Sequence, residues 1–402
     1  MIAWSMIGQI VYVLCQLTIV VSLARFGTVE DVGRFGLSTA ITGPIFFFFS
    51  LGLRYNIATD TSSSFGFGTF LAVRLLGALG GLLTVAAIAG LTIRDPLTLT
   101  ILALFALAKA VDLHSDLTYG VFQKHGKLRW VAMSQILRGT ISAVLFIAIM
   151  ILDGSPGLAF LTFFTVWLAV LLLHDLPRAF VLEGRVHRIA SPKEIWSLVW
   201  NSAPLGAAGF FAHLSASTPR LVIANLIGLE ALGYFTSVAY FFQAANMLIQ
   251  SVTHAIIGRL AKLWGEGNSR AFWLIMLRIS AILFALAFIA GLAAIPLGAH
   301  VLALFFGEDY RPYGILLVLM TFALAINVPA PVLETGLMAQ RRFTAQLVNR
   351  IIFSILVAVF CPIAVILYGL NGAAIGFAVA AAVQLPVVIF FLRRARWPKS
   401  GG

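Results

Sequence analysis

Long apolar stretches follow one another along the whole chain and are separated by short polar segments. One of them, residues 141–152, reads ISAVLFIAIMIL. A helix needs about 20 apolar residues to cross about 30 Å of hydrocarbon, and stretches of this length recur. Strands of a membrane barrel would alternate apolar and polar residues within segments of about ten, which these stretches do not. The pattern therefore predicts an all-α polytopic membrane protein.

About twelve membrane-spanning helices are predicted. The spans are 2–23, 35–53, 66–92, 97–117, 130–152, 157–180, 196–219, 230–256, 271–296, 314–336, 346–367 and 371–392. The longest connection, about residues 181–195, is basic and too short for a soluble domain. Gly43 and Pro44 are predicted to break the second helix, because proline removes a backbone hydrogen bond.

Composition and charge agree with this class and add an orientation. Of the 402 residues, 61% are hydrophobic and 10% are charged, whereas soluble domains carry about 25% charged residues. Lys and Arg accumulate in cytoplasmic loops. Most of the 27 Lys and Arg residues lie in turns on the side of the N-terminus. The opposite side holds Arg25, Arg34, Arg94, Arg220 and Arg311.

Both termini are therefore predicted to be cytoplasmic, with the protein in the cytoplasmic (inner) membrane. The net charge of +12 predicts contact with anionic lipids. The basic residues are scattered over short loops, which argues against binding to nucleic acid.

Three motifs occur twice, in the same order and about 200 residues apart. RFGTVEDVGRFGLS (25–38) pairs with LIGLEALGYFTS (226–237), YGVFQKHGK (119–127) with TGLMAQRRF (335–343), and LDGSPGLA (152–159) with LYGLNGAA (367–374). Helix ends and tight turns explain glycine in one copy but not the same order in two. A duplication of a six-helix unit explains both.

An even number of helices gives both copies the same membrane orientation. The chain is therefore predicted to form two parallel-oriented six-helix repeats around a central cavity, with a substrate path between them. The predicted parts are an N-terminal lobe (1–185), a cytoplasmic basic linker (186–195), a C-terminal lobe (196–394) and a cytoplasmic tail (395–402).

Five motifs in order carry a resemblance to a known family. They are ARFGTVEDVGRFGLS, LGLRYNIA (51–58), LIGLEALGYFTSVA, LFFGEDYRPYGILL (304–317) and YGLNGAAIG (368–376). Across essentially the whole chain the sequence resembles the polysaccharide biosynthesis and O-antigen (Wzx-type) flippases of the multidrug/oligosaccharidyl-lipid/polysaccharide exporter superfamily. It departs from them in two ways. Thr218 and Pro219 precede Arg220 where similar members often carry an Asp beside the Arg, and many members have fourteen helices.

The resemblance implies a function and partners. It implies transfer of a polyprenyl-diphosphate-linked oligosaccharide from the cytoplasmic to the outer leaflet, for O-antigen, capsule or exopolysaccharide. It also implies a cavity lined by the first, second, seventh and eighth helices. Polysaccharide polymerase and glycosyltransferase machinery are the further partners that it implies.

Polar residues form one-sided stripes on three of these helices. The stripes are Ser5, Gln9, Tyr12 and Gln16; His213, Ser217 and Arg220; and Thr236, Tyr240, Gln243, Gln250 and His254. Lipid makes such stripes costly, so they are predicted to face protein or a watery cavity. Their hydroxyls and amides match the hydroxyls of a sugar chain. The alternative is hydrogen bonding between helices.

Two arginines are candidate ligands for the diphosphate of such a lipid, because guanidinium pairs with phosphate in a bidentate manner. Arg220 lies near the outer end of the seventh helix and Arg54 near the inner end of the second. The alternative for each is an interfacial arginine that extends towards water. His213 is either a hydrogen-bonded core residue or a titrating switch.

Other intramembrane charges are predicted to be structural. An acid at the end of one helix precedes an arginine in the next helix in both copies. This order predicts two equivalent ion pairs, Asp116–Arg138 and Glu334–Arg350. Lys109 and Asp112 are spaced for a local pair.

The sequence offers no enzyme chemistry: it has no P-loop, no metal-ligand spacing and no Ser/His/Asp set, and Cys15 and Cys361 suggest neither a disulfide nor a metal site. No cofactor is predicted. A cation-coupled small-molecule or drug antiporter of the same superfamily is the alternative function. That branch usually needs a carboxylate in the first half, and the first two helices have none. A membrane glycosyltransferase, polymerase or ligase would need a large outer loop.

Overall fold

The computed structural model describes residues 2–59, 65–184 and 191–394. Across these ranges the chain is almost entirely helical and contains no strand. The side chains of Ser5 and His254, from the predicted polar stripes, lie outside the described part, as do residues 186–190 of the basic linker and the whole tail.

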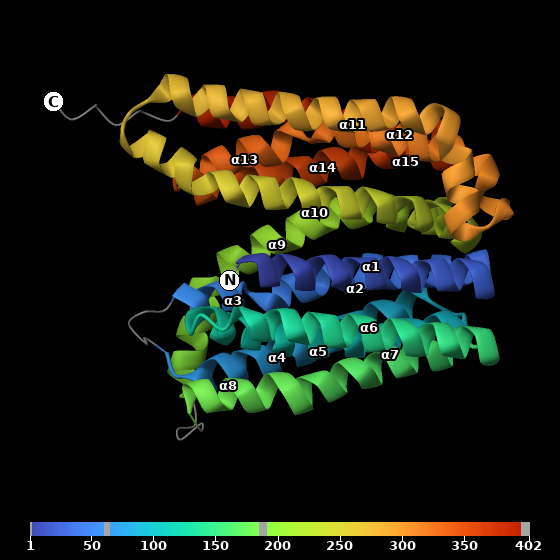
Figure 1. Ribbon diagram of the computed structural model, residues 1–402, viewed down its shortest axis with the longest axis horizontal. Helices are drawn as coiled ribbons and strands as arrows, with labels where there is room; N and C mark the ends of the chain where they lie inside the picture. Colours follow the sequence, from blue (N-terminus) through green and yellow to red (C-terminus); the bar gives the residue numbers. More distant parts are fainter. Residues whose placement is uncertain (1, 60–64, 185–190, 395–402) are drawn as a thin grey trace. The chain divides into compact units, whose positions relative to one another are not determined.

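The chain divides into two compact units, and the first comprises Met1–Ser217. Its helices are α1 (Ile2–Phe26), α2 (Val29–Ser50), α3 (Leu53–Thr59), α4 (Phe67–Thr92), α5 (Pro96–Lys124), α6 (Leu128–Leu152), α7 (Pro156–Val170), the π-helical turn η1 (Leu171–Asp175) and α8 (Leu176–Glu183), followed by most of α9 (Pro192–Leu226) (Figure 1).

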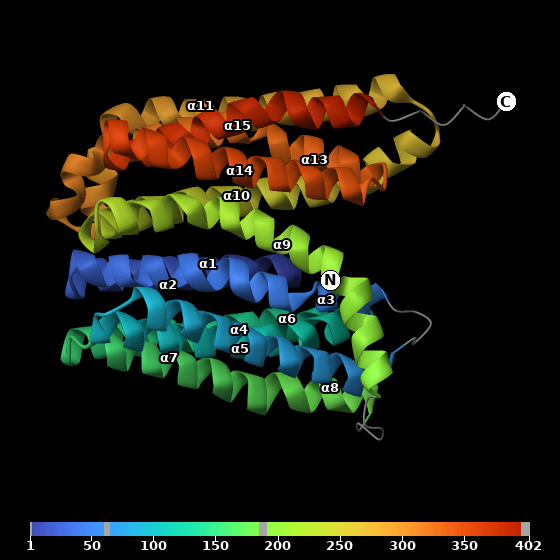
Figure 2. The same cartoon turned by 180° about the vertical axis from the view of Figure 1, so that it is seen from behind.

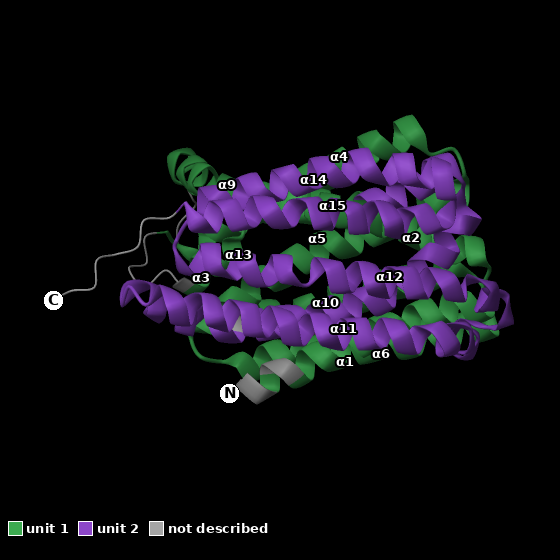
Figure 3. Ribbon diagram, turned by 90° about the horizontal axis from the view of Figure 1, so that it is seen from above, with its two compact units in different colours: residues 1–217 green, residues 218–402 purple. Residues whose placement is uncertain are grey.

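The second unit comprises Thr218–Gly402. After the end of α9 it contains α10 (Leu229–Gly265), α11 (Ser269–Phe306), the 3₁₀ turn η2 (Glu308–Tyr313), α12 (Gly314–Asn327), α13 (Pro329–Ala339), α14 (Phe343–Tyr368) and α15 (Leu370–Arg393) (Figures 2 and 3). The boundary between the units falls within α9.

Each predicted span coincides with one helix or with consecutive helices. Ten of these stretches, within the described residues, are long and apolar enough to cross a membrane. The other two are α9 and α10, which carry two of the predicted polar stripes. The predicted fold class, an all-α polytopic membrane protein with about twelve membrane helices, is confirmed.

The second predicted span is interrupted, but not where the sequence suggested. α2 continues through Pro44 to Ser50, so the predicted break at Gly43–Pro44 is wrong. The break lies at Leu51 and Gly52, whose φ angles are +50° and +59°. A left-handed leucine is strained, so packing around the break must hold it there.

The repeated motifs lie at equivalent junctions in the two halves. The first pair falls at the α1–α2 and α9–α10 turns, the second at α5–α6 and α13–α14, and the third at α6–α7 and α14–α15. At the first turn, Thr28 and Asp31 form a capping box that begins α2, satisfying backbone N–H groups at the helix start. At the equivalent turn Gly228 has a φ of +126°, which glycine adopts without strain.

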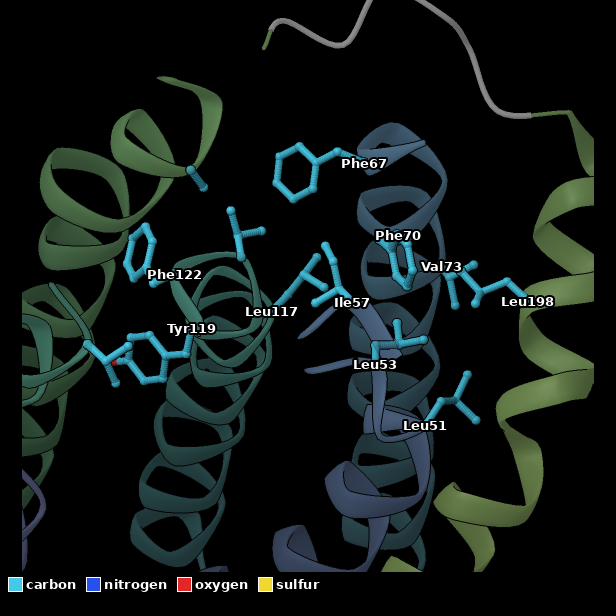
Figure 4. Packing of buried hydrophobic residues seen from close by; sticks show 13 residues of the cluster. Leu51, Leu53, Ile57, Phe67, Phe70, Val73, Leu117, Tyr119, Phe122 and Leu198 are labelled. Atoms are coloured by element: carbon cyan, nitrogen blue, oxygen red, sulfur yellow. The ribbon is translucent and has the colours of Figure 1, made fainter. Parts of the chain in front are cut away.

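Each unit has its own apolar core. In the first unit, the core side chains come from four helices: Ile57 of α3 lies beside Leu117 of α5, and Leu198 of α9 points towards Val73 of α4 (Figure 4). In the second, Phe272, Leu337 and Leu392 belong to an equivalent cluster. α14 and α15 approach closely, because a Cβ atom on Gly376 would lie only 2.6 Å from the Cα of Cys361. Small residues at such crossings allow membrane helices to pack.

Candidate functional site

Two carboxylates on α5 organise the charges inside the first unit. Asp112 and Asp116 are four residues apart and therefore share one helix face. Asp112 Oδ1 lies 2.9 Å from Arg138 Nη2 of α6, and its Oδ2 lies 3.4 Å from Lys109 Nζ. Asp112 is thus compensated by two cations, as the cost of charge in a membrane requires.

Asp116 joins two further elements to α5. Its Oδ1 lies 3.4 Å from Arg54 Nη1 of α3, and its Oδ2 lies 3.4 Å from Arg74 Nη2 of α4. Arg74 is completely buried and also donates to the carbonyl of Ser50, 3.2 Å away, at the C-terminal end of α2. Through these two contacts, Arg74 of α4 connects the end of α2, just before the α2–α3 break, to α5.

The predicted Asp116–Arg138 ion pair is wrong: the acidic partner of Arg138 is Asp112. The turn between α5 and α6 lies at residues 125–127. In such a hairpin Arg138 is level with the midpoint between Asp112 and Asp116, so spacing alone cannot choose between them. In the second unit the predicted partners do meet: Arg350 Nε lies 3.5 Å from Glu334 Oε2. Asn349 also donates to Glu334 Oε1, at 2.9 Å.

Arg54, a predicted phosphate ligand, is held within the first unit. Besides Asp116, its Nε donates to Gln123 Oε1 at 3.3 Å, and its guanidinium lies 5.6 Å from the centre of the Tyr119 ring. These contacts give Arg54 a structural role. A role towards substrate stays a prediction.

Part of the α1 stripe faces the interior of the first unit. The guanidinium of Arg138 lies 5.7 Å from the ring centre of Tyr12 and 4.4 Å from that of Trp167, within the range of cation–π attraction. Gln9 accepts a hydrogen bond of 3.1 Å from Gln135 of α6. The Nε2 of Gln16 is buried without a hydrogen-bond partner.

The two first-unit residues of the α9 stripe face α2. The His213 ring stacks on Phe47, with 3.4 Å between ring centres. A Cβ atom on Gly43 would lie 3.7 Å from Ser217 Oγ and 3.9 Å from His213 Nδ1. Gly43 therefore leaves room for both polar side chains beside α2.

Arg220 and the α10 stripe lie in the second unit. The Nε of Arg220 is buried without a hydrogen-bond partner, and Tyr240 is close enough for electrostatic attraction. Among the described residues, Arg220 forms no ion pair with a carboxylate. Gln243 and Gln250 are exposed on α10. Arg220 is thus an intramembrane cation whose charge the described chain does not neutralise.

Comparison with known protein families gives a match. The model of a family described as "Polysaccharide biosynthesis protein" matches residues 1–264. The chain belongs to this family of polysaccharide biosynthesis proteins. The family-level resemblance found in the sequence motifs is thereby confirmed.

Relatives of this polysaccharide biosynthesis protein agree in length and fold. The capsular polysaccharide biosynthesis protein CapF of Staphylococcus aureus is 25% identical over 397 residues, covering 97% of this chain and 98% of CapF. The lipid II flippase MurJ, in an inward closed conformation, has a TM-score of 0.78 at 13% identity, over 98% of this chain and 88% of that structure. An inward-facing multidrug resistance MATE family transporter of the MOP superfamily has a TM-score of 0.76 at 14% identity, over 97% of each chain.

One pair of buried ionisable residues in this family member was missed by the sequence reasoning. His174 and Asp175 lie in η1, and His174 Nδ1 is 2.9 Å from Asp175 Oδ1. Both lie inside the predicted span 157–180 and are followed two residues later by Pro177. Adjacent ionisable residues within an apolar span, next to a proline, were the signal that could have revealed them.

Proposed function

We propose that this polysaccharide biosynthesis protein flips a lipid-linked oligosaccharide across the cytoplasmic membrane, by alternating access of its two lobes. The product serves surface polysaccharide assembly. Support comes from the family, from the fold it shares with flippases and related transporters, and from the repeated six-helix plan. On this proposal the termini are cytoplasmic, and the substrate is a polyprenyl diphosphate carrying sugars.

One observation carries the proposal: Arg220 is an intramembrane guanidinium with a buried, unpaired Nε and no carboxylate partner in the described chain. An unpaired charge is costly within a membrane, so a ligand that compensates it is expected. A diphosphate provides the negative charge and the bidentate geometry that guanidinium prefers. The exposed amides of Gln243 and Gln250 suit the sugar hydroxyls.

The test is a leaflet-resolved measurement of lipid-linked saccharides in a deletion strain. Cytoplasmic-face glycan intermediates are expected to accumulate, and the wild-type protein is expected to clear them. Arg220→Ala is expected to slow clearance by about tenfold or more, because a charge-assisted hydrogen bond contributes about 1.5–3 kcal/mol and 1.4 kcal/mol is tenfold. Arg220→Lys keeps the charge and is expected to retain part of the activity.

Arg278→Ala is the matched control, because Arg278 is an exposed arginine of α11 in the same unit. It is expected to behave like wild type. Unchanged glycans in the deletion strain, together with reduced export of small cationic compounds, would replace the flippase with the antiporter.

A further inference from the structure

The helix that contains η1 changes its hydrogen-bonding pattern inside the first unit. The N–H of Leu176 donates to the carbonyl of Leu171, one residue further back than in an α-helix. Pro177 explains the change, because it lacks an N–H and its ring clashes with the carbonyl four residues earlier. Such π-turns within α-helices are frequent at functional sites.

The π-turn brings together two ionisable side chains that are neighbours in sequence. Neighbouring residues of a regular helix do not face each other, yet His174 Nδ1 lies 2.9 Å from Asp175 Oδ1. The Asp175 side chain is 0% exposed and that of His174 is 8% exposed. The second carboxylate oxygen of Asp175, Oδ2, is buried without a hydrogen-bond partner.

The charged and titratable surroundings of this dyad come from three elements. Arg138 of α6 and Tyr119 of α5 lie within electrostatic reach of Asp175. Arg178 of α8 donates from Nη1 to the backbone carbonyl of His174, at 3.0 Å. α7 contains no titratable residue. Arg138 therefore forms its 2.9 Å ion pair with Asp112 and is also attracted electrostatically by Asp175.

Other polar atoms near Arg138 are also buried without partners: Gln135 Oε1, Trp167 Nε1, and Nε and Nη1 of Arg138 itself. Buried polar atoms are normally satisfied by protein or by ordered water. Gln135 is hydrogen-bonded to Gln9, whose residue is exposed. These groups mark a polar route from Gln9 through Gln135 and Arg138 towards the dyad.

We propose that His174 and Asp175 form a proton-binding site through which a proton gradient drives transport. The site rests on the proposed transport function, to which it adds the energy source. Neutral His174 donates its Nδ1–H to Asp175 and accepts a proton at Nε2. The resulting imidazolium remains paired with the Asp175 carboxylate, and release of the same proton to the other side restores the neutral ring.

Proton binding has a structural consequence through Arg138. The added positive charge repels the guanidinium, which then pairs more strongly with Asp112. Because these residues belong to α6, α5 and η1, protonation changes how three elements of the first unit are held together. Chains of Asp, Glu and His residues inside membranes serve as proton relays in pumps and transporters.

Proton binding is measured first without substrate, by infrared difference spectroscopy of the reconstituted full-length protein as the pH is lowered from neutral. Wild type is expected to show an imidazolium signal that is lost in His174→Gln and altered in Asp175→Asn. His125→Gln is the matched control, because His125 Nε2 lies 3.0 Å from Glu183 Oε1 in an exposed pair of the same unit. A wild-type spectrum from both dyad variants would overturn the proposal.

Transport is then measured in proteoliposomes that contain a synthetic polyprenyl-diphosphate-linked saccharide, with and without an imposed pH gradient. The gradient is expected to accelerate wild type and His125→Gln several-fold. Asp175→Asn and His174→Gln are expected to flip at the rate seen without a gradient, whereas Asp175→Glu keeps a titratable group and retains the response. A merely structural role would not restore the response in Asp175→Glu alone.

The two proposals fail in different ways. A wild-type protein that flips the lipid at the same rate with and without the gradient overturns the proton site and leaves the flippase. A wild-type protein that does not move the lipid overturns the flippase, and the infrared result then decides whether the dyad binds a proton.

Discussion

At the scale of single residues, each carboxylate of α5 binds two cations. Asp112 holds Lys109 and Arg138, and Asp116 holds Arg54 and Arg74. The four cations come from four helices, so the two acids tie α3, α4 and α6 to α5. Removing one partner leaves the other charge buried without compensation. The resulting loss of folding free energy is larger than the net contribution of the pair.

Asp112→Asn is therefore expected to lower the free energy of unfolding by about 3 kcal/mol, and Asp112→Asn with Arg138→Gln is expected to recover part of this loss. Unfolding in detergent micelles measures both. Glu308→Gln is the control, because the Arg311–Glu308 pair is exposed and such pairs contribute about 1 kcal/mol or less. Equal losses in Asp112→Asn and Glu308→Gln would contradict the bracing role.

Asp95 provides a pH-dependent case outside the membrane spans. It caps the start of α5. Hydrogen bonds from the Thr98 hydroxyl and backbone N–H, followed by the contact with Arg34, hold the pKa of its carboxyl below the usual value. A lowered pKa means that the stabilisation is present above the unfolded-state pKa and is lost as the pH falls through the folded-state pKa.

Asp95→Ala is expected to lower stability by about 1 kcal/mol at neutral pH. The difference from wild type is expected to shrink on acidification, because the wild-type carboxylate then also loses its charge. Melting temperatures across this pH range measure it. If the stability difference between Asp95→Ala and wild type stays constant or grows towards acid pH, the ionised Asp95 carboxylate does not stabilise the start of α5.

The sequence revealed which residues carry charge inside the membrane and two of their pairs, Lys109–Asp112 and Glu334–Arg350. It did not reveal the partners of Arg138 and Arg74. The existence of an acid and a following arginine in both halves was readable from spacing. Arg138 pairs with Asp112 and not with Asp116 because of how α6 is shifted along α5. A shift of about half a helical turn separates the two possibilities. Arg74 had no predicted partner, because Asp116 and the Ser50 carbonyl reach it only through the packing of α4 against α2 and α5.

At the scale of elements, breaks and close contacts depend on neighbouring helices. Pro44 remains inside α2, whereas the chain turns at Leu51 and Gly52. Arg74 binds the Ser50 carbonyl just before the turn, and a Cβ atom on Gly77 of α4 would lie 2.7 Å from the carbonyl oxygen of Phe49. The break is therefore stabilised by α4, which a reading of the α2 sequence alone does not include.

The α14–α15 contact gives a prediction at this scale. Gly376→Ala is expected to destabilise the protein by about 1–3 kcal/mol, because the added methyl group overpacks the interface with α14. Gly90→Ala in α4 is the control, because its added Cβ would meet no atom within 4 Å. That variant is expected to be neutral or to gain up to about 1 kcal/mol from helix propensity.

Thermal unfolding of both glycine variants in detergent measures this difference. If Gly376→Ala is as stable as Gly90→Ala, α14 and α15 do not pack as closely as described.

At the scale of the whole molecule, the duplicated motifs and the basic turns predict the topology. The turn after α5 and the turn after α10 are predicted to be cytoplasmic, and those after α6 and α11 are predicted to lie outside. The physical reason is that Lys and Arg are retained on the cytoplasmic side during insertion.

Single cysteines in a background lacking Cys15 and Cys361 test this topology. His125→Cys and Glu266→Cys are expected to react with a membrane-impermeant maleimide only after the cells are permeabilised. Asp153→Cys and Glu308→Cys are expected to react in intact cells. Reaction of His125→Cys in intact cells would reverse the predicted orientation and the direction of the proposed transport.

The membrane class, the number of spans and the internal repeat followed from the sequence, because apolar length and helix-turn chemistry are local properties. The stripes on α1, α9 and α10 were also visible, since their spacing is that of one helix face. What each stripe contacts was settled by packing: Tyr12 meets Arg138, and His213 meets Phe47. The His174–Asp175 contact likewise needed the π-turn beside Pro177. Local pattern thus decides which segments become membrane helices, whereas partners depend on registers between helices that no single segment encodes.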